Sequence, residues 1–509
     1  MLSGGPDKRW TLVAVCMTTF MLLVDITIVN VALPSVQRSL NASLTGLQWV
    51  VDAYAITLAA LILTAGSLAD RYGRRLLFAL GVSIFTLASF LCGVAPNIAS
   101  LDAARALQGV GGAALFATAL ALIGAEYQGP ERGRAIAAWG STVGLAVAAG
   151  PLLGGIITDA LSWRWIFFVN VPIGAFALAL ALRKLRESRD PGTTRTDVAG
   201  LLFFSAALFL IVFALLRGND VGWSSGQIIG TLAGGVLLMA GFVLVEIRQS
   251  HPMLDVSLFR RRAFLGVQLA TFCLGAGMFA LFPFLSIYLQ DIDGNSPLGA
   301  GLRFLPITAF VFLVPLVTRG PAARAPMWAL LSVSLALTSA GVLLMDLIKV
   351  GSSWTVLLAG FIVSGIGIGL ANPTIAGAAL RVVDPARTGM ASGISNTCRI
   401  GGLAVGVAVL GASLQQRVGN HLVAAGHPGK KIAAAVSSSG LRAAHGDSQL
   451  AGIANAAFVS GFRLILLIGS LTLLTGAVFA AVLVRARAFA SATAVDPGQN
   501  PASAGQIRP

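Results

Sequence analysis

Long apolar runs separated by short polar segments dominate the pattern of this chain of 509 residues. Each run is close to the roughly 20 residues that an α-helix needs to cross a bilayer. We expect fourteen such helices, at 10–33, 48–68, 76–95, 101–125, 134–157, 165–182, 198–216, 225–245, 264–289, 299–317, 327–346, 354–376, 393–414 and 458–484. The runs lack the alternation of short barrel strands. The pattern therefore predicts an all-α polytopic membrane protein.

Composition agrees with this fold class and excludes others. Hydrophobic residues make up 56% of the chain and charged residues only 11%, whereas soluble domains carry about a quarter of charged residues. The formal net charge of +15 would suit a nucleic-acid partner. However, the basic residues lie in short loops between apolar runs, where membrane topology requires them. We therefore expect no nucleic-acid partner.

The distribution of basic residues also predicts an orientation. Counted loop by loop, 23 Lys and Arg residues fall on one side of the predicted membrane, and the short loops on the other side hold few. The positive-inside rule then places both termini in the cytoplasm. The excess of Arg over Lys and the abundance of Ala and Gly indicate a bacterial genome, and hence the plasma membrane as the location.

Two polar stretches lie outside the predicted helices. The segment 415–457 is polar and we expect a flexible outer loop; its histidines lack metal-ligand spacing, so we expect no metal site. The segment 488–509 is small, Pro-containing and predicted to be a disordered cytoplasmic tail.

An internal duplication is indicated by short matches at a nearly constant offset. The pairs are 46–49 with 301–304, 108–111 with 364–367, and 130–132 with 385–387, at offsets of 255, 256 and 255 residues. Parallel repeats of six helices are the plan of the major facilitator fold. We therefore predict an N-terminal bundle at 1–183, an inserted helix pair at 184–262 and a C-terminal bundle at 263–487, which includes the outer loop.

Asp25 is the residue that first suggests a function. It lies within the first apolar run, where insertion scales give a cost of about 2.5–3.5 kcal/mol for an acid near the bilayer centre. An anchoring helix would avoid this cost, so we interpret Asp25 as a functional group that faces protein or water. It should lie about 12 Å from the outer end of its helix.

Two other runs could supply partners for this acid. Arg105 and Gln108 lie on one face of the fourth helix, three residues apart, and a buried arginine needs an anionic or carbonyl partner. Alternatively, Arg105 could extend to the outer surface, about 6 Å away. Asp52 in the second helix enters from the same side, although it could be simply solvated. We rank Asp25 first as a proton carrier, Arg105 second as its charge partner and Asp52 third.

A polar loop between the second and third runs contains one acid among three arginines. Its residues of interest are Gly66, Asp70, Arg71, Gly73, Arg74 and Arg75. The arginines alone fit an ordinary cytoplasmic loop, but they do not explain an acid at the end of a helix or the glycines that flank it. We therefore favour a functional role for this loop.

The fifth and thirteenth runs carry further groups of interest. In the fifth run, a proline and several glycines permit a bend and close helix contact, as expected at a moving interface; they are Gly144, Gly150, Pro151, Gly154 and Gly155. In the thirteenth run, Ser392, Asn396 and Arg399 share a helical face. Arg399 could be an intramembrane counter-charge or could extend to the inner surface.

These motifs together resemble one family. The loop 66–75, the run 105–112, the cluster 150–155 and the string 25–34, which includes Asn30, are similar to the fourteen-helix drug:proton antiporters of the major facilitator superfamily, which are bacterial multidrug and antibiotic exporters. The resemblance is stronger in the first half than in the second. It implies that Asp70 and its arginines form a cytoplasmic gate, that Arg105 takes part in proton transfer, and that the cluster around Pro151 marks an antiporter.

We therefore expect a monomeric, proton-coupled antiporter that lies in the lipid bilayer and exports hydrophobic or cationic amphiphilic drugs or antibiotics across the bacterial plasma membrane by alternating access. The proton gradient would be its energy source, with no cofactor. The chain lacks a phosphate-binding GxxxxGK[ST] loop, and no nucleophile–base arrangement indicates an enzyme. The alternatives are a proton-coupled importer of a nutrient or siderophore, and a membrane sensor that transports nothing.

Overall fold

The computed structural model describes residues 6–42, 44–189, 197–249, 254, 256–318, 325–381, 388–426, 432–433, 436–437 and 448–484. Throughout these residues the regular secondary structure is helical, and all fourteen predicted runs are helical. Twelve helices of this described part are long and apolar enough to cross a membrane. The run predicted at 299–317 is divided into two short helices, of 7 and 13 residues. The predicted all-α membrane fold is confirmed.

In the described residues, the first half of the chain and the helix pair that follows it form nine helices. They are α1 (Pro6–Leu40), α2 (Leu44–Tyr72), α3 (Arg74–Val94), α4 (Ile98–Glu126), α5 (Gly129–Ala160), α6 (Trp165–Phe168), α7 (Asn170–Lys184), α8 (Val198–Val221) and α9 (Gly226–Arg248).

In the described residues, the second half begins with a 3-10 turn, and the stretches 262–292 and 297–317 are each divided into shorter elements. Its elements are η1 (Val256–Arg260), α10 (Arg262–Gly277), η2 (Phe279–Leu281), α11 (Phe282–Ile287), η3 (Tyr288–Ile292), α12 (Pro297–Arg303), α13 (Leu305–Val317), α15 (Met327–Met345), α16 (Val356–Arg381), α17 (Thr388–Ala424) and α19 (Ser448–Leu483).

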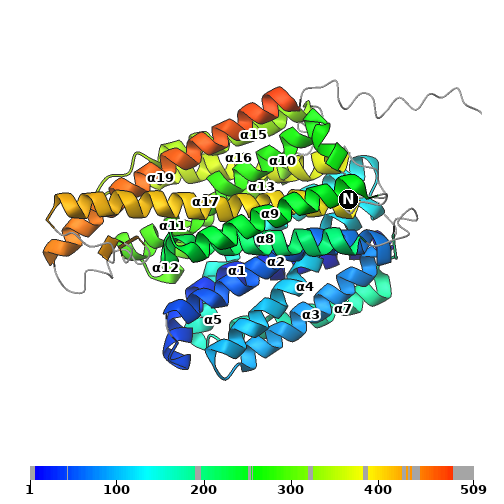
Figure 1. The fold of residues 1–509 in the computed structure, drawn as a ribbon, viewed down its shortest axis with the longest axis horizontal. Helices are drawn as coiled ribbons and strands as arrows, with labels where there is room; N and C mark the ends of the chain where they lie inside the picture. The colour runs from blue at the N-terminus through cyan, green and yellow to red at the C-terminus, as the bar shows by residue number, and fades with distance from the viewer. Residues whose placement is uncertain are drawn as a thin grey trace, which may run out of the picture.

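The two halves use the same pattern of helix pairing. In the first half, α1 packs against α5 and α7, α2 against α4, and α3 against α4 and α7. In the second half, α10 packs against α17 and α19, α13 against α16, and α15 against α16 and α19. Helices α8 and α9 pack on each other, and α8 also contacts α2 and α17, so the pair lies along the seam between the halves (Figure 1).

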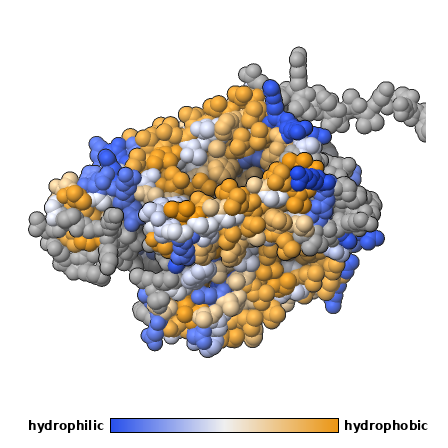
Figure 2. Space-filling view, in the orientation of Figure 1, coloured by the Kyte–Doolittle hydropathy of each residue, from blue (hydrophilic) through white to orange (hydrophobic). Residues whose placement is uncertain are grey.

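The face of the molecule in Figure 2 is largely apolar between its two ends. Figure 2 shows hydrophobic residues across the middle of the visible face and hydrophilic residues gathered towards the ends. We call the end that holds the turn between α2 and α3 the Asp70 end, and the end that holds the turn between α15 and α16 the Asp346 end. An apolar belt of this kind is what a lipid-facing surface requires.

Two predicted boundaries are wrong. Helix α1 continues beyond residue 33 to Leu40, so Asp25 lies 15 residues before its end, about 22 Å along the helix. The segment 415–457 is not one flexible loop, because α17 continues to Ala424 and α19 begins at Ser448.

Burial explains why the helices extend at the Asp346 end. Val418 and Leu422 of α17 are buried in one apolar cluster with Ala433 and Val436, which lie in short helical stretches. Apolar contact therefore stabilises backbone that the polar composition of the segment assigns to a loop. The predicted tail at 488–509 lies outside the described residues.

Candidate functional site

The carboxylate of Asp25 is fully buried inside the first half, where three side chains donate hydrogen bonds to it. Arg105 of α4 donates from Nη1 to Oδ2 over 2.5 Å, and Gln108 of α4 donates from Nε2 to Oδ1 over 2.9 Å. Asn170, the first residue of α7, donates from Nδ2 to Oδ1 over 3.0 Å. Asp25 therefore joins α1 to α4 and α7 through one charged group.

Arg105 is buried as completely as its partner, with 1% of the side chain exposed. Its Nε donates to the carbonyl oxygen of Val50 over 2.9 Å, and Nη1 also donates to Oε1 of Gln108 over 2.6 Å. The ring of Tyr54 lies 4.3 Å from the guanidinium carbon, close enough for a cation–π interaction. The alternative in which Arg105 extends to the surface is therefore wrong.

Two members of this network were not predicted. They are Ser89 and Asn170, which are both buried. Ser89 of α3 accepts hydrogen bonds from Gln108 over 2.7 Å and from Asn170 over 3.3 Å. An asparagine inside an apolar run is a signal that could have singled out Asn170, because a buried amide needs partners. A single serine in a membrane helix carries little such information.

The remaining predicted members of this cluster lie elsewhere or cannot be placed. Asp52 is half-buried on α2, two residues before Tyr54, so it points away from the face that carries the Tyr54 ring. The side chain of Asn30 lies outside the described residues, although its backbone is part of α1. The structure thus brings together Asp25, Arg105 and Gln108 of the predicted set.

A second buried ion pair lies at the Asp70 end. Oδ1 of Asp70 accepts from Nε and Nη2 of Arg74 over 2.9 and 2.8 Å. Oδ2 of the same carboxylate accepts from the backbone N–H of Met390 over 2.9 Å. Met390 lies in the first turn of α17, where free N–H groups and the helix dipole favour an anion. Asp70 therefore connects the first half to the second.

The loop around Asp70 has a specific backbone geometry. Gly73 has φ +123°, and a methyl group placed on it would lie 2.5 Å from the carboxyl carbon of Glu187. The two oxygens of Glu187 accept from the backbone N–H groups of Arg75 and Leu76 over 3.0 and 3.1 Å, at the start of α3. Glu187, which follows α7, is a cap for α3 that the sequence did not reveal.

Three other predicted residues of this loop occupy distinct positions. The Arg75 guanidinium donates from Nη2 to the carbonyl oxygen of Leu182 over 2.7 Å. Arg71 lies with its guanidinium carbon 5.0 Å from the ring of Tyr72. Gly66 lies on α2, one turn before Asp70.

The glycines of α5 allow close contact with both halves. A methyl group on Gly150 would overlap Oγ1 of Thr27 in α1, two residues after Asp25. A methyl group on Gly144 would overlap Val311 of α13, in the second half. Gly154 abuts α1 in the same way as Gly150, and Gly155 lies near α12. Pro151 belongs to α5 but its side chain lies outside the described residues. Helix α5 thus lies between the helix of Asp25 and the second half.

In the second half, buried polar groups are left without partners. The Asn396 amide donates to the carbonyl oxygen of Phe116 in α4 over 3.4 Å. Oγ of Ser392, Nε of Arg399 and both amide atoms of Asn372 have no hydrogen-bond partner among the described residues. Asn372 of α16 lies beside Gly140 of α5, at the seam between the halves. Unlike the Asp25 network, this polar set is incomplete.

The fold and the buried charges define a class of protein. Two bundles with the same helix pairing, joined at one end by Asp70 and holding a buried acid–arginine pair, are the architecture of a membrane transporter built from parallel repeats.

The sequence places the chain in a family. It matches the Major Facilitator Superfamily over residues 15–407, and the chain belongs to that family. The chain is therefore a transporter protein and not an enzyme.

Relatives of the chain share most of its length. It is 40% identical over 412 residues to "Multidrug resistance protein Stp" of Mycobacterium tuberculosis (strain CDC 1551 / Oshkosh), covering 79% of this chain and 75% of that protein. It is 38% identical over 415 residues to "Puromycin resistance protein pur8" of Streptomyces alboniger, covering 80% and 82%. It is 32% identical over 427 residues to the "Tetracenomycin C resistance and export protein" of Streptomyces glaucescens, covering 82% and 78%.

Solved structures share the fold at low sequence identity. The human organic anion transporter MFSD10 (TETRAN) has a TM-score of 0.61 and 16% identity, over 92% of this chain and 100% of that chain. The proton:xylose symporter XylE also has a TM-score of 0.61, with 12% identity, over 94% and 96%.

Proposed function

We propose that this protein is a proton-coupled antiporter that exports amphiphilic drugs or antibiotics by alternating access, with Asp25 as the proton carrier. The observation that carries the proposal is the buried ion pair between Asp25 and Arg105. The names of the relatives support the substrate class, since they are drug and antibiotic resistance proteins.

The ion pair provides a way to link proton binding to helix arrangement. With Asp25 ionised, its charge is balanced by Arg105 and its oxygens accept three hydrogen bonds. A proton on Asp25 would remove the charge that balances the buried guanidinium, and an unbalanced buried charge is strongly unfavourable. Protonation therefore favours another arrangement of α1 and α4, and that arrangement in turn favours protonation.

The contacts between the halves suggest how this change reaches the rest of the molecule. At the Asp70 end, the carboxylate of Asp70 connects the halves, and Gly393 of α17 packs against Leu63 of α2. Helix α5 touches α1 next to Asp25 and touches α13 in the second half. A shift of α1 would therefore change the contact between α5 and the second half, and with it the separation of the bundles.

The incomplete polar set of the second half offers contacts for the drug. Buried donors and acceptors without partners lose free energy unless a ligand or water supplies a partner. Asn372, Ser392 and Arg399 have such atoms on α16 and α17, the helices that face the first half. In this arrangement, the first half would carry the proton and the second half would bind polar groups of the drug.

The orientation is part of the proposal. The excess of basic residues in loops of the Asp70 end favours the cytoplasmic side of a bacterial plasma membrane for this end. The halves would then be closed towards the cytoplasm. Labelling of single cysteines in intact cells tests this, and access from outside to a cysteine at the exposed position of Tyr72 would contradict it.

Transport in proteoliposomes tests the proton carrier. With an imposed pH gradient, the wild type should accumulate puromycin or ethidium against its own gradient, and Asp25→Asn should equilibrate the drug without accumulation. Asp102→Asn is the matched control, because Asp102 is another acid on α4, and its buried Oδ1 has no hydrogen-bond partner among the described residues. Uphill movement by Asp25→Asn at the wild-type rate would show that Asp25 is not the carrier. A wild type that moves neither drug uphill would contradict drug antiport.

A further inference from the structure

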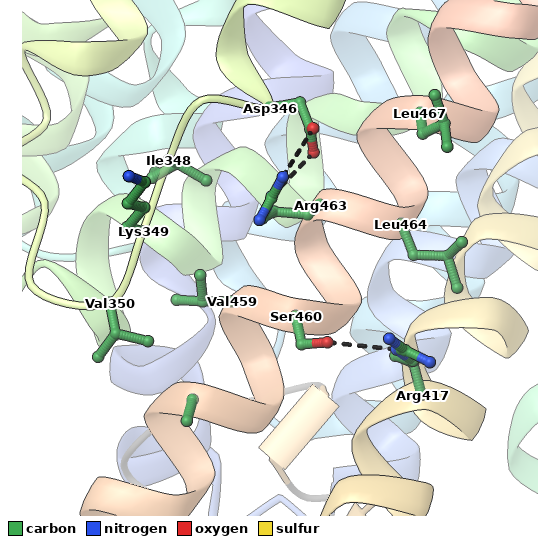
Figure 3. A pocket seen from close by; sticks show the side chains of 11 residues that line it. Asp346, Ile348, Lys349, Val350, Arg417, Val459, Ser460, Arg463, Leu464 and Leu467 are labelled. Carbon is green, nitrogen blue, oxygen red and sulfur yellow. Dashed lines mark hydrogen bonds and ion pairs between the residues drawn. The ribbon is translucent and has the colours of Figure 1, made fainter.

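A cavity of about 570 Å³ opens at the Asp346 end, between the end of α15, α17 and α19. Figure 3 shows Asp346 and the turn after α15 on one side of it, Arg463 and Ser460 of α19 at its back, and Arg417 of α17 opposite. Leu464 and Leu467 of α19 also line it. The cavity thus combines a charged part with an apolar part.

The charged part is predominantly cationic. Lys349, Arg417 and Arg463 line the cavity, together with a single carboxylate, that of Asp346. Arg463 donates from Nε and Nη2 to the two oxygens of Asp346 over 3.2 and 3.1 Å, so this carboxylate is already engaged. Arg417 donates only from Nε, to Ser460 over 3.2 Å, and has no ion pair with a described residue. Two cations are therefore available to an anion.

The length of α15 sets the depth of the cavity in the membrane. This helix has 19 residues and would span about 28 Å, close to the thickness of the hydrocarbon core. Asp346 follows directly after it, and so lies at the level of the lipid headgroups. Trp354, which lies in the turn between α15 and α16, packs on the guanidinium of Arg303 at 5.4 Å. Tryptophans are enriched at the level of the lipid headgroups in membrane proteins.

The cavity is continuous with a lipid-facing surface. Arg463 is 48% exposed, and it stands at the top of a row of exposed apolar residues on α19, three or four positions apart. These residues are Leu467, Leu471, Leu474, Val478 and Val482. Residues at this spacing lie along one face of a helix, so the row runs from the charged part of the cavity into the hydrocarbon region.

We infer that this cavity binds an anionic phospholipid, with the headgroup phosphate between Lys349, Arg417 and Arg463 and an acyl chain along the row of α19. Arginine suits this role, because its planar donors match the oxygens of a phosphate. Cations at this end are also unusual, since topology concentrates them at the other end. The lipid would connect α15, α17 and α19 of the second half. This site is separate from the proton network of the first half.

Native mass spectrometry of the full-length protein in neutral detergent tests the inference. Phosphatidylglycerol and phosphatidylcholine with identical acyl chains are added at equal concentrations, and bound lipids are counted. The wild type should retain one more phosphatidylglycerol than the Lys349→Gln/Arg417→Gln variant. A basic residue near a lipid surface contributes about 1 kcal/mol, so each substitution should weaken binding about fivefold. Both side chains are exposed, and the single Lys349→Gln change provides an intermediate.

Controls separate this site from general attraction to basic surfaces. Arg217→Gln removes a basic side chain at the same end, on α8, and should retain wild-type binding. Equal retention of both lipids, or unchanged phosphatidylglycerol binding in the double variant, would overturn the inference. Displacement of the lipid by equimolar glycerol phosphate would also overturn it, because the cavity would then be a site for soluble anions.

Discussion

The buried pair of Asp25 and Arg105 allows a quantitative test by a double-mutant cycle. The perturbations are Asp25→Asn, Arg105→Gln and the two combined, and all replace a charged side chain by a neutral amide. Both parent side chains are at most 1% exposed, and they meet over 2.5 Å. Solvent therefore screens the pair little, and each charge depends on the other.

The structure gives the size and order of the effects. Asp25→Asn leaves the Arg105 guanidinium buried without a counter-charge, a loss of about 3–5 kcal/mol. The new amide would keep its oxygen towards the donors Gln108 and Asn170, and its NH2 group would then face the donor Nη1 of Arg105. Arg105→Gln should cost less, because a buried acid can become neutral by taking up a proton. The double variant contains neither charge, and its loss should fall short of the sum by about 2 kcal/mol or more.

The assay is unfolding of the purified protein by sodium dodecyl sulfate in mixed micelles, followed by tryptophan fluorescence. The same cycle on Asp346 and Arg463 is the matched control. This pair has two hydrogen bonds, whereas Arg105 and Asp25 share one, but its side chains are 24% and 48% exposed, so we expect coupling below about 1 kcal/mol. The reasoning would be refuted if the two cycles gave equal coupling, or if the double variant were as unstable as Asp25→Asn.

Three further predictions concern the gate and the glycines. Asp70→Asn should slow transport and increase hydrogen exchange in the first turn of α17, because the neutral amide loses the anionic contact with that helix. Hydrogen exchange is measured by mass spectrometry, and unchanged exchange would mean that the contact does not hold the halves together. Gly150→Ala should reduce the transport rate, because the new methyl group would overlap Thr27. Gly155→Ala should be tolerated, because its methyl group would lie 3.6 Å from the nearest atom. Equal transport rates for the two variants would contradict close packing as the reason. Gly73→Ala should destabilise the protein by about 1 kcal/mol or more in the same unfolding assay, because φ is +123° and the methyl group would meet Glu187. An unfolding midpoint equal to that of the wild type would show that the loop adapts.

Some of the site could be predicted because its residues are costly where they lie. Asp25 and Arg105 stand out within apolar runs, since ionised groups in a membrane require partners. Gln108 followed from helical spacing relative to Arg105. Ser89 did not, because a hydroxyl in a membrane helix can donate to a carbonyl oxygen of its own helix, as Thr18 does to Ala14. Asn170 could have been predicted, because a buried amide needs partners.

The incomplete polar set is an example of what the sequence suggested only in outline. Ser392, Asn396 and Arg399 were predicted to share a face, but spacing within one helix does not show what lies opposite. The structure places Asn396 against the backbone of α4 and leaves Ser392 and Arg399 with unpartnered atoms. Asn372 joins this set from another helix.

By itself, the sequence determined that the chain crosses a membrane many times, and where almost every helix lies. The free energy of transferring a run of apolar residues into lipid depends on that run alone, so composition is sufficient to identify it. It also singled out Asp25 as a candidate functional residue, because the cost of placing a carboxylate in an apolar run depends on that run alone.

Only the tertiary structure decided which distant groups meet. Asp70 and Met390 are 320 residues apart, and their contact depends on how the two bundles pack. The extension of α17 and α19 at the Asp346 end could not be predicted from the sequence for the same reason. Its polar residues favour a loop. The buried apolar cluster that includes Leu422 and Val436 and stabilises the helix exists only when remote segments are folded together.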